Sequence, residues 1–282
     1  MSVFVSLFLG LVQGITEFLP ISSSGHLSIL QNLFNLRYSQ DDHLLFEALL
    51  HLGTLVSICV VYRSEIRTMI SDGLDFLRMR NDSDVDEPVV LKPPGRALLL
   101  VLAGTVPLLL VLIFQGSVRR LFTNTAFIGF ALIITGGVLF VSDRFIRKGN
   151  KTEKTMTIAD AVIIGLAQAA AVVPGLSRSG TTISVGLARG LSGSFAVRFS
   201  LLLAIPAIFG ATIVELYKAI RDGIDFSLFP IYLAGAVIAA AVGFFAIQLI
   251  RRLMARNSFG KFAYYCWGVG ALTMVLSLVL GR

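Results

Sequence analysis

The chain has 282 residues, of which 55% are hydrophobic and only 15% are charged. Soluble domains carry about 25% charged residues, so this composition excludes an ordinary soluble domain and indicates that lipid is the solvent. The net charge of +7 is not carried by a separate basic domain, so nucleic acid is not expected as a partner. The expected partners of the basic loops are membrane lipids, in particular anionic headgroups.

Six apolar stretches are long enough to cross a bilayer as helices, which takes roughly 20 residues each. They cover about 44–62, 96–115, 125–142, 197–216, 227–250 and 262–280. Two more apolar regions, 1–33 and 158–192, are interrupted by polar residues, prolines and glycines at 19–26 and 174–180. Each half is too short to span, so both regions are expected to form re-entrant helix–loop–helix hairpins buried in protein. The predicted fold is a single all-α integral membrane domain over 1–282.

The two interrupted regions match each other at a constant offset of 155 residues. Six identical pairs occur at this offset: Gly10 and Gly165, Leu11 and Leu166, Gln13 and Gln168, Ser22 and Ser177, Ser24 and Ser179, and Gly25 and Gly180. Each repeat, about 1–142 and about 158–282, then consists of one hairpin and three spans. Because three is an odd number, the second repeat is expected to enter from the opposite side, as an inverted-topology repeat.

Lys and Arg residues are divided unevenly between the two sides that this topology predicts. One side carries 17 of them, in the loops 63–96, 143–160, 188–198 and 251–261. The other side carries 6, in 34–43, 116–124, 217–226 and the C-terminus. The positive-inside rule places the first side in the cytoplasm and both termini outside. The segment 63–95 is expected to be a solvated cytoplasmic loop without a catalytic part.

Glu17 is an ionisable residue inside the first apolar region, and Gln13 lies four residues before it. On a helix these two side chains share a face. A charge inside a membrane is costly, which makes Glu17 a functional-site candidate. Two oxygen ligands on one face suit a hard cation such as Mg²⁺ or Ca²⁺ that phosphates also hold. The alternative is a polar packing pair with a protonated Glu17.

The residues that follow add hydroxyls and an imidazole. The sequence Ser-Ser-Ser-Gly-His at 22–26 includes Ser23 and His26. Serines at such a position are often helix caps. His26 can act as a general acid or base near neutral pH. A lone histidine is more often structural, but His26 lies only nine residues after Glu17.

Arg178 lies inside the second interrupted region, whereas the other Lys and Arg residues lie in loops or near span ends. Its neighbours include Ser177, Ser179 and Thr182. A guanidinium with hydroxyls and the amides at a helix start favours phosphate or diphosphate. The alternative is a structural salt bridge to Glu17, and both interpretations can hold in the empty protein.

Other polar residues in or near the apolar stretches receive lesser roles. Glu47 is expected to support the site indirectly, through residues that contact the substrate. Glu215 is expected to reach water, and Asp160 is expected to cap the first helix of the second hairpin. No role is predicted for His43 or His51.

Two stretches resemble the motifs of one family. Gln13-Gly14-Ile15-Thr16-Glu17-Phe18-Leu19-Pro20, with the run at 22–26, resembles the [E/Q]xxxE region of the BacA-type undecaprenyl-diphosphate phosphatases. Pro174-Gly175-Leu176-Ser177-Arg178-Ser179-Gly180-Thr181-Thr182 fits that family's PGxSRSxxT motif at each fixed position. The resemblance covers essentially the full chain in length and span order.

This resemblance implies hydrolysis of undecaprenyl diphosphate to undecaprenyl phosphate and inorganic phosphate in a bacterial plasma (inner) membrane. It further implies a need for Mg²⁺ or Ca²⁺, recycling of the cell-wall lipid carrier, and resistance to bacitracin. Carried over by motif, the catalytic residues are Glu17, Ser23, His26 and Arg178. Gln13 and Glu17 face the metal. The substrate-binding residues are Ser22, Ser24, Gly25, Ser177, Ser179, Gly180 and Thr182.

Several alternatives stay open. Glutamine at position 13 removes one anionic metal ligand that other members of the family have. The second repeat has Val172 and Thr181 where the first has Glu17 and His26, so one site built from both halves is expected. Glu17 can act as base toward Ser23 or toward water. An inverted-repeat transporter or lipid flippase is the rival function, and a homodimer is compatible with the sequence.

Overall fold

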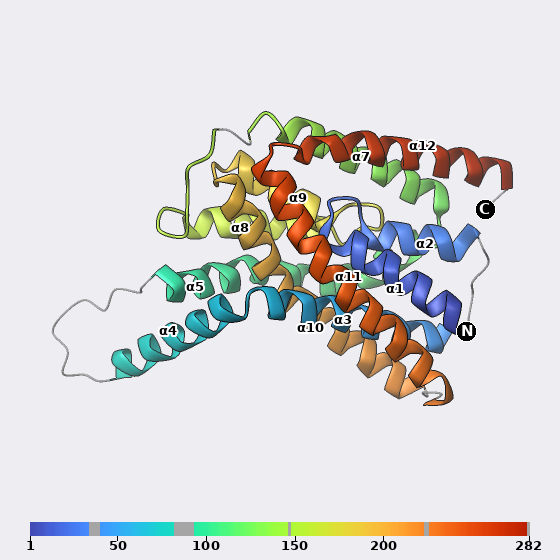
Figure 1. Ribbon diagram of the computed structural model, residues 1–282, viewed down its shortest axis with the longest axis horizontal. Coiled ribbons are helices and arrows are strands. Elements are labelled where there is room, and N and C mark those ends of the chain that lie inside the picture. Colours follow the sequence, from blue (N-terminus) through green and yellow to red (C-terminus); the bar gives the residue numbers. More distant parts are fainter. Residues whose placement is uncertain (34–39, 82–92, 146–147, 223–225, 281–282) are drawn as a thin grey trace.

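In the computed structural model the chain is almost entirely helical (Figure 1). The structure describes residues 1–33, 40–81, 93–145, 148–222 and 226–280. Within these ranges the only extended pairing is an isolated bridge between Lys151 and Leu191. The predicted all-α class is therefore confirmed.

The helices follow one another with short connections. The first half contains α1 (Val3–Phe18), α2 (Ser23–Leu33), α3 (Gln40–Val61), α4 (Arg63–Asn81), α5 (Pro93–Thr105), the 3₁₀ helix η1 (Val106–Leu110), α6 (Val111–Leu121) and α7 (Thr125–Ser142). The second half contains α8 (Ile158–Ala170), α9 (Arg178–Ala188), α10 (Gly193–Asp222), η2 (Phe226–Leu228), α11 (Phe229–Ala255), η3 (Phe259–Lys261) and α12 (Phe262–Leu280).

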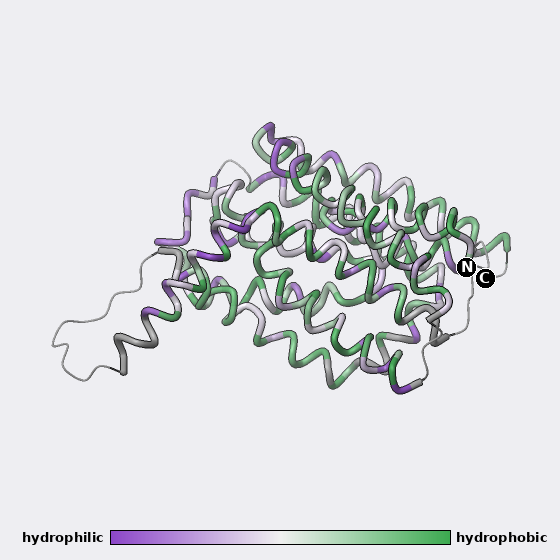
Figure 2. Tube along the Cα trace, turned by 60° about the horizontal axis from the view of Figure 1, so that its bottom comes forward, coloured by the Kyte–Doolittle hydropathy of each residue, from purple (hydrophilic) through white to green (hydrophobic). Residues whose placement is uncertain are grey.

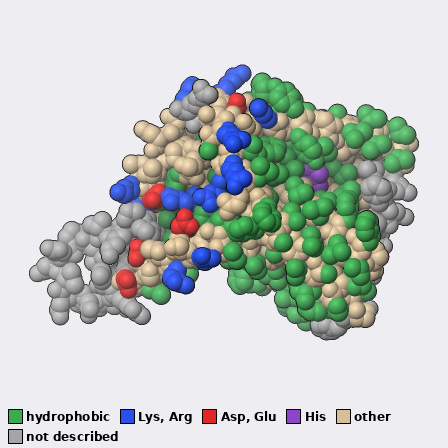
Figure 3. All heavy atoms as spheres, viewed as in Figure 1, with side chains coloured by type: hydrophobic (Ala, Val, Ile, Leu, Met, Phe, Trp, Pro, Cys, Tyr) green, Lys and Arg blue, Asp and Glu red, His purple; other side chains and the backbone are tan. Residues whose placement is uncertain are grey.

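The outer surface of the helices is that of a multi-pass membrane protein. α7, α10, α11 and the segment Phe259–Leu280 are long and apolar enough to span, and the bent pair α3–α4 is a fifth candidate. Figure 2 shows hydrophobic residues along much of the helical part of the chain. Large side chains such as Phe245 and Leu278 are 70% and 78% exposed, as lipid contact requires. In Figure 3 hydrophobic side chains cover much of the visible face, while Lys and Arg gather toward one end.

The predicted number of six spans is not confirmed, and the stretch 96–115 shows one reason. It is not one continuous α-helix, because α5 ends at Thr105 and five residues of 3₁₀ helix precede α6. Pro107 has no backbone N–H to donate to the preceding turn. The Thr105 hydroxyl donates to the carbonyl oxygen of Val101 at 2.7 Å, which competes with the backbone pattern.

The prediction of a loop over 63–95 is wrong for its first part, because Arg63–Asn81 is the helix α4. Residues 82–92 lie outside the described residues. α4 is bent by 80° from α3 and packs against α5. Met69 is buried while Arg67 is exposed, so this is an amphipathic helix whose charged face resembled a loop in the sequence.

Both interrupted regions form two short helices joined by a turn, as predicted. α1 and α2 make the first hairpin, and α8 and α9 make the second. α1 lies along α11, while α8 packs against α5 and η1, and α9 contacts α7, α8 and α10. Neither α1, with 16 residues, nor α8, with 13, is long enough to span alone.

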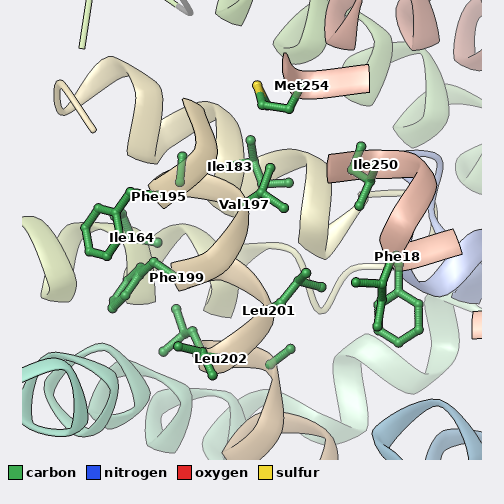
Figure 4. Packing of buried hydrophobic residues seen from close by; sticks show 14 of the residues in the cluster. Phe18, Ile164, Ile183, Phe195, Val197, Phe199, Leu201, Leu202, Ile250 and Met254 are labelled. Carbon is green, nitrogen blue, oxygen red and sulfur yellow. The ribbon is translucent and has the colours of Figure 1, made fainter. Parts of the chain in front are cut away.

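The main hydrophobic core surrounds α10, which connects the second hairpin to the rest of the protein. Phe195 and Phe199 of α10 are buried beside Ile164 of α8 and Ile183 of α9 (Figure 4). Phe18, at the end of α1, is fully buried in the same cluster. The two hairpins are therefore held in one rigid core, which fixes the position of the loops between their helices.

Candidate active site

The loops of the two hairpins meet at the polar centre of the protein. Arg178 Nη2, at the start of α9, donates to Glu17 Oε1 at 2.7 Å, near the end of α1. The Ser179 hydroxyl donates to the carbonyl oxygen of Leu19 at 3.1 Å. A Cβ atom built on Gly25 would lie 3.0 Å from Gly175. The salt bridge considered from the sequence is therefore present, and the two loops touch directly.

The two loops use the same local hydrogen bonds. Ser22 Oγ accepts from the backbone N–H three residues later at 3.2 Å, and Ser177 Oγ does so at 3.1 Å. The hydroxyls of Ser22 and Ser24 lie 3.4 Å apart, and those of Ser177 and Ser179 lie 3.3 Å apart. Ser22 and Ser177 thus act as helix caps, the alternative role that the sequence allowed.

The Glu17 carboxylate is the hub of the cluster and is almost fully buried. Besides Arg178 it receives two further hydrogen bonds, both on Oε2. Ser23 Oγ donates at 2.5 Å and Gln13 Nε2 at 3.0 Å. A carboxylate in short contact with a hydroxyl is the arrangement of a base beside a nucleophile. Four residues predicted from sequence therefore form one connected set.

The residues at this centre fit a hard cation. Gln13 is fully buried, and its Oε1 has no hydrogen-bond partner among the described residues. This oxygen and the neighbouring Glu17 carboxylate are the two ligand types that Mg²⁺ and Ca²⁺ accept. Within the described residues no group of three or more His, Cys, Asp or Glu could hold a metal.

His26 stands at the edge of the cluster, with both ring nitrogens engaged. Nδ1 lies 2.8 Å from the carbonyl oxygen of Ser22, and Nε2 lies 2.9 Å from the hydroxyl of Tyr265 on α12. The two rings stack, with centroids 5.7 Å apart and planes inclined by 11°. Sequence reasoning missed Tyr265, because it lies in an apolar span 239 residues away.

Hydroxyl groups on the long helices brace the second loop. Thr135 of α7 donates to the carbonyl oxygen of Gly175 at 2.9 Å and accepts from Ser177 N at 3.2 Å. The hydroxyl oxygen of Thr182 lies 2.6 Å from the hydroxyl oxygen of Ser200 on α10. Sequence reasoning missed Thr135 and Ser200, although a polar residue inside an apolar span was a usable signal for both.

Further polar contacts join α2 to α3 and α3 to α10. His51 Nδ1 is 3.4 Å from Glu215 Oε2, and Gln31 donates to Glu47 at 3.4 Å. The sequence assigned His51 no role, and in the structure its ring contacts the Glu215 carboxylate. The side chain of His43 lies outside the described residues.

Asp160 caps α8, as predicted, at the Lys/Arg-rich loops rather than at the cluster. It forms a capping box with Thr157, and Lys151 and Arg189 each donate to its carboxylate at 2.8 Å. Burial would raise the pKa of Asp160, but the hydrogen bonds from Lys151, Thr157 and Arg189 hold that pKa well below its usual value. Asp160 is therefore a charged structural anchor.

The helical fold and this cluster define a class: a multi-pass membrane protein with a buried, ion-paired centre suited to phosphoryl chemistry. The chain belongs to the family of Bacitracin resistance protein BacA, which it matches over residues 6–272. It is 39% identical to the undecaprenyl-diphosphatase of Carboxydothermus hydrogenoformans, over 98% of each chain. It is 40% identical to that of Syntrophotalea carbinolica, over 98% of this chain and 100% of the other. The corresponding protein of Halothermothrix orenii is 34% identical, over 98% and 99%.

Proposed function

We propose that this protein is an undecaprenyl-diphosphate phosphatase, which hydrolyses undecaprenyl diphosphate to undecaprenyl phosphate and inorganic phosphate. Membership of the BacA family and the names of its relatives support this function. The reaction recycles the cell-wall lipid carrier and confers resistance to bacitracin. The observation that carries the proposal is the contact of Glu17 with both Ser23 and Arg178. The transporter or flippase alternative is not favoured, because a transporter does not need a base beside a hydroxyl.

Arg178 binds the diphosphate. Its guanidinium is paired with Glu17 in the structure, and an incoming diphosphate, with more negative charge, competes for the same donor. Transfer of the guanidinium to the phosphate oxygens would leave Glu17 with only Ser23 and Gln13. Substrate binding and release of the catalytic carboxylate are then the same event.

Glu17 acts as the base toward Ser23. It takes the hydroxyl proton, Ser23 Oγ attacks the terminal phosphorus, and the bond between that phosphorus and the bridging oxygen breaks. Undecaprenyl phosphate leaves, and water then hydrolyses the phosphoserine to inorganic phosphate. The 2.5 Å contact between Ser23 and Glu17 favours this route over direct attack by water. In the water route, Glu17 would instead take a proton from the attacking water.

Gln13 Oε1 and the Glu17 carboxylate would hold a Mg²⁺ or Ca²⁺ ion together with the substrate. Such an ion, when bound, offsets negative charge on the phosphate oxygens. Gln13 contributes a neutral ligand, so the substrate must supply most of the anionic oxygens. This supports a cation that binds with the diphosphate rather than before it.

The substrate's polyprenyl chain would lie against the apolar helices, with only its headgroup in the polar centre. The matching hairpin loops support an inverted repeat with two re-entrant hairpins. The beginning of α1 and the end of α12 lie at one end of the molecule (Figure 1), and Lys and Arg gather toward the other (Figure 3). This supports a cytoplasmic charged end with both termini outside. The family resemblance favours a site that opens on the outer face.

The test is inorganic phosphate release from a polyprenyl diphosphate by the purified protein in detergent, with Mg²⁺, with Ca²⁺ and with EDTA. Detergent abolishes any gradient, so a transporter would release nothing. We expect release that depends on the cation and that falls at least about 100-fold in Glu17→Ala, as loss of a general base predicts. Absence of release by folded wild-type protein would overturn the proposal.

A further inference from the structure

The partner of His26 on α12 is placed by rigid packing. Cys266, next to Tyr265 in the chain, is fully buried, with its thiol 3.7 Å from the carbonyl oxygen of Pro20. The indole Nε1 of Trp267 donates to the carbonyl oxygen of Ile133 on α7 at 3.2 Å. α12 is thus fixed both to the first hairpin loop and to α7. Tyr265 therefore occupies a defined position beside His26.

The hydrogen bonds of His26 assign its tautomer. A carbonyl oxygen only accepts, so Nδ1, which faces the carbonyl of Ser22, carries the hydrogen. In the neutral ring Nε2 then bears a lone pair, and the hydroxyl of Tyr265 donates to it. The near-parallel stacking of the two rings restricts rotation of the imidazole. The Ser22 carbonyl thus sets which nitrogen carries the lone pair, and Tyr265 contacts that nitrogen and stacks on the ring.

We propose that Tyr265 is a positioning residue for His26, a role that rests on the proposed phosphatase function. Its hydroxyl holds Nε2 in the resting protein, and its ring keeps the imidazole in the orientation that proton transfer at Nε2 requires. When the phosphate headgroup of the substrate binds, the Tyr265 hydroxyl releases His26 Nε2. The device combines residues from both halves of the chain, like the pair of Glu17 and Arg178.

A matched pair of neighbouring tyrosines makes the test specific. Tyr265→Phe removes the hydroxyl and keeps the stacked ring. Tyr264→Phe is the control. Tyr264 is more exposed than Tyr265, and its ring packs in a T-shaped arrangement with Trp267 rather than against His26. We expect Tyr265→Phe to lower kcat by about 10-fold, with KM within about 2-fold, since orientation acts on the chemical step. The control is expected to match the wild type in both constants and in thermal midpoint.

A double-mutant cycle separates positioning from general stability. In a His26→Gln background Tyr265→Phe should have no further effect on kcat, because its effect passes through the imidazole. Equal losses in both backgrounds, or wild-type kcat in Tyr265→Phe, would overturn the proposal and leave the phosphatase function standing.

A measurement that needs no substrate turnover tests the role of Tyr265 separately from the phosphatase function. In ¹⁵N-histidine-labelled protein, the Nε2 resonance, assigned by its loss in His26→Gln, should shift in Tyr265→Phe and not in Tyr264→Phe. An unchanged resonance contradicts the proposal. Wild-type protein that releases no phosphate contradicts the proposed function, and the resonance still decides whether Tyr265 holds Nε2.

Discussion

At the residue scale, the proposed chemistry depends on one buried carboxylate that accepts hydrogen bonds from three side chains. Arg178, Ser23 and Gln13 all donate hydrogen bonds to the Glu17 carboxylate. The negative charge of this carboxylate balances the positive charge of the Arg178 guanidinium. Removing either partner of such a buried pair leaves an uncompensated charge. Substitutions at Ser23 test the nucleophile separately, because they remove a hydroxyl and leave the ion pair in place.

Ser23→Ala is expected to lower the rate of phosphate release by at least about 10³-fold, as loss of a nucleophile does. The matched control is Ser28→Ala, which changes a buried serine further along α2 and should leave the rate close to wild type. The measurement is initial-rate phosphate release, with acid quenching to trap phosphoserine in the wild type. Near-wild-type activity of Ser23→Ala would contradict the serine route and favour water.

At the element scale, close contacts between helices place the hairpins. A Cβ atom at Gly165 of α8 would lie 2.0 Å from the carbonyl oxygen of Gly104 on α5, and one at Gly10 of α1 would lie 2.3 Å from that of Gly235 on α11. Small residues at such crossings let backbones approach, which is how helices associate in lipid. The equivalent glycines of the two hairpins thus serve the same purpose.

Gly165→Val is expected to reduce the yield of folded protein severely, because the new side chain meets backbone that cannot move aside. Gly137→Val is the control, since nothing lies within 4 Å of a Cβ atom there. Size-exclusion chromatography and thermal midpoints in detergent provide the comparison. A folded Gly165→Val with a wild-type midpoint would show that α8 does not pack as described.

Asp160→Asn should lower the stability of the protein by about 1–2 kcal/mol, through loss of the capping box and of the charge that Lys151 and Arg189 share. Because the pKa of Asp160 is depressed in the folded protein, its stabilising effect is present above the ordinary aspartate pKa and is lost as pH falls below it. The thermal midpoint of Asp160→Asn should therefore be lower than that of the wild type at pH 7, and the two midpoints should converge toward low pH. Equal midpoints at pH 7 would contradict this role.

Sequence patterns predicted some elements better than others. The stretches 125–142 and 262–280 coincide with α7 and α12, because a long apolar run without proline forms one continuous helix. The segment 63–81 was misread, because charge density does not distinguish a loop from an amphipathic helix. The residues of the candidate site were largely predictable from local motifs. Thr135 and Ser200 carried the weaker signal of a polar residue inside an apolar span, but the contact that each makes depends on tertiary packing. Tyr265 carried no local signal, because it reaches His26 only through the packing of α12.

At the scale of the whole molecule, the site exists only where the two hairpins meet. Each half supplies what the other lacks: the first provides the acid and the hydroxyl, and the second provides the guanidinium. Four of the catalytic and metal residues predicted from sequence are in direct contact, and His26 stands beside them with α12 as its support. We propose that this joint centre hydrolyses the lipid diphosphate.

The most direct test is the initial rate of phosphate release from a polyprenyl diphosphate by Arg178→Ala, beside the wild type and an Arg252→Ala control at the charged end. We expect Arg178→Ala to lower this rate by at least about 10²–10³-fold, because it removes a preorganised charge at the transferring phosphate. The control should keep the wild-type rate. Wild-type activity in folded Arg178→Ala would contradict a site shared by the two hairpins.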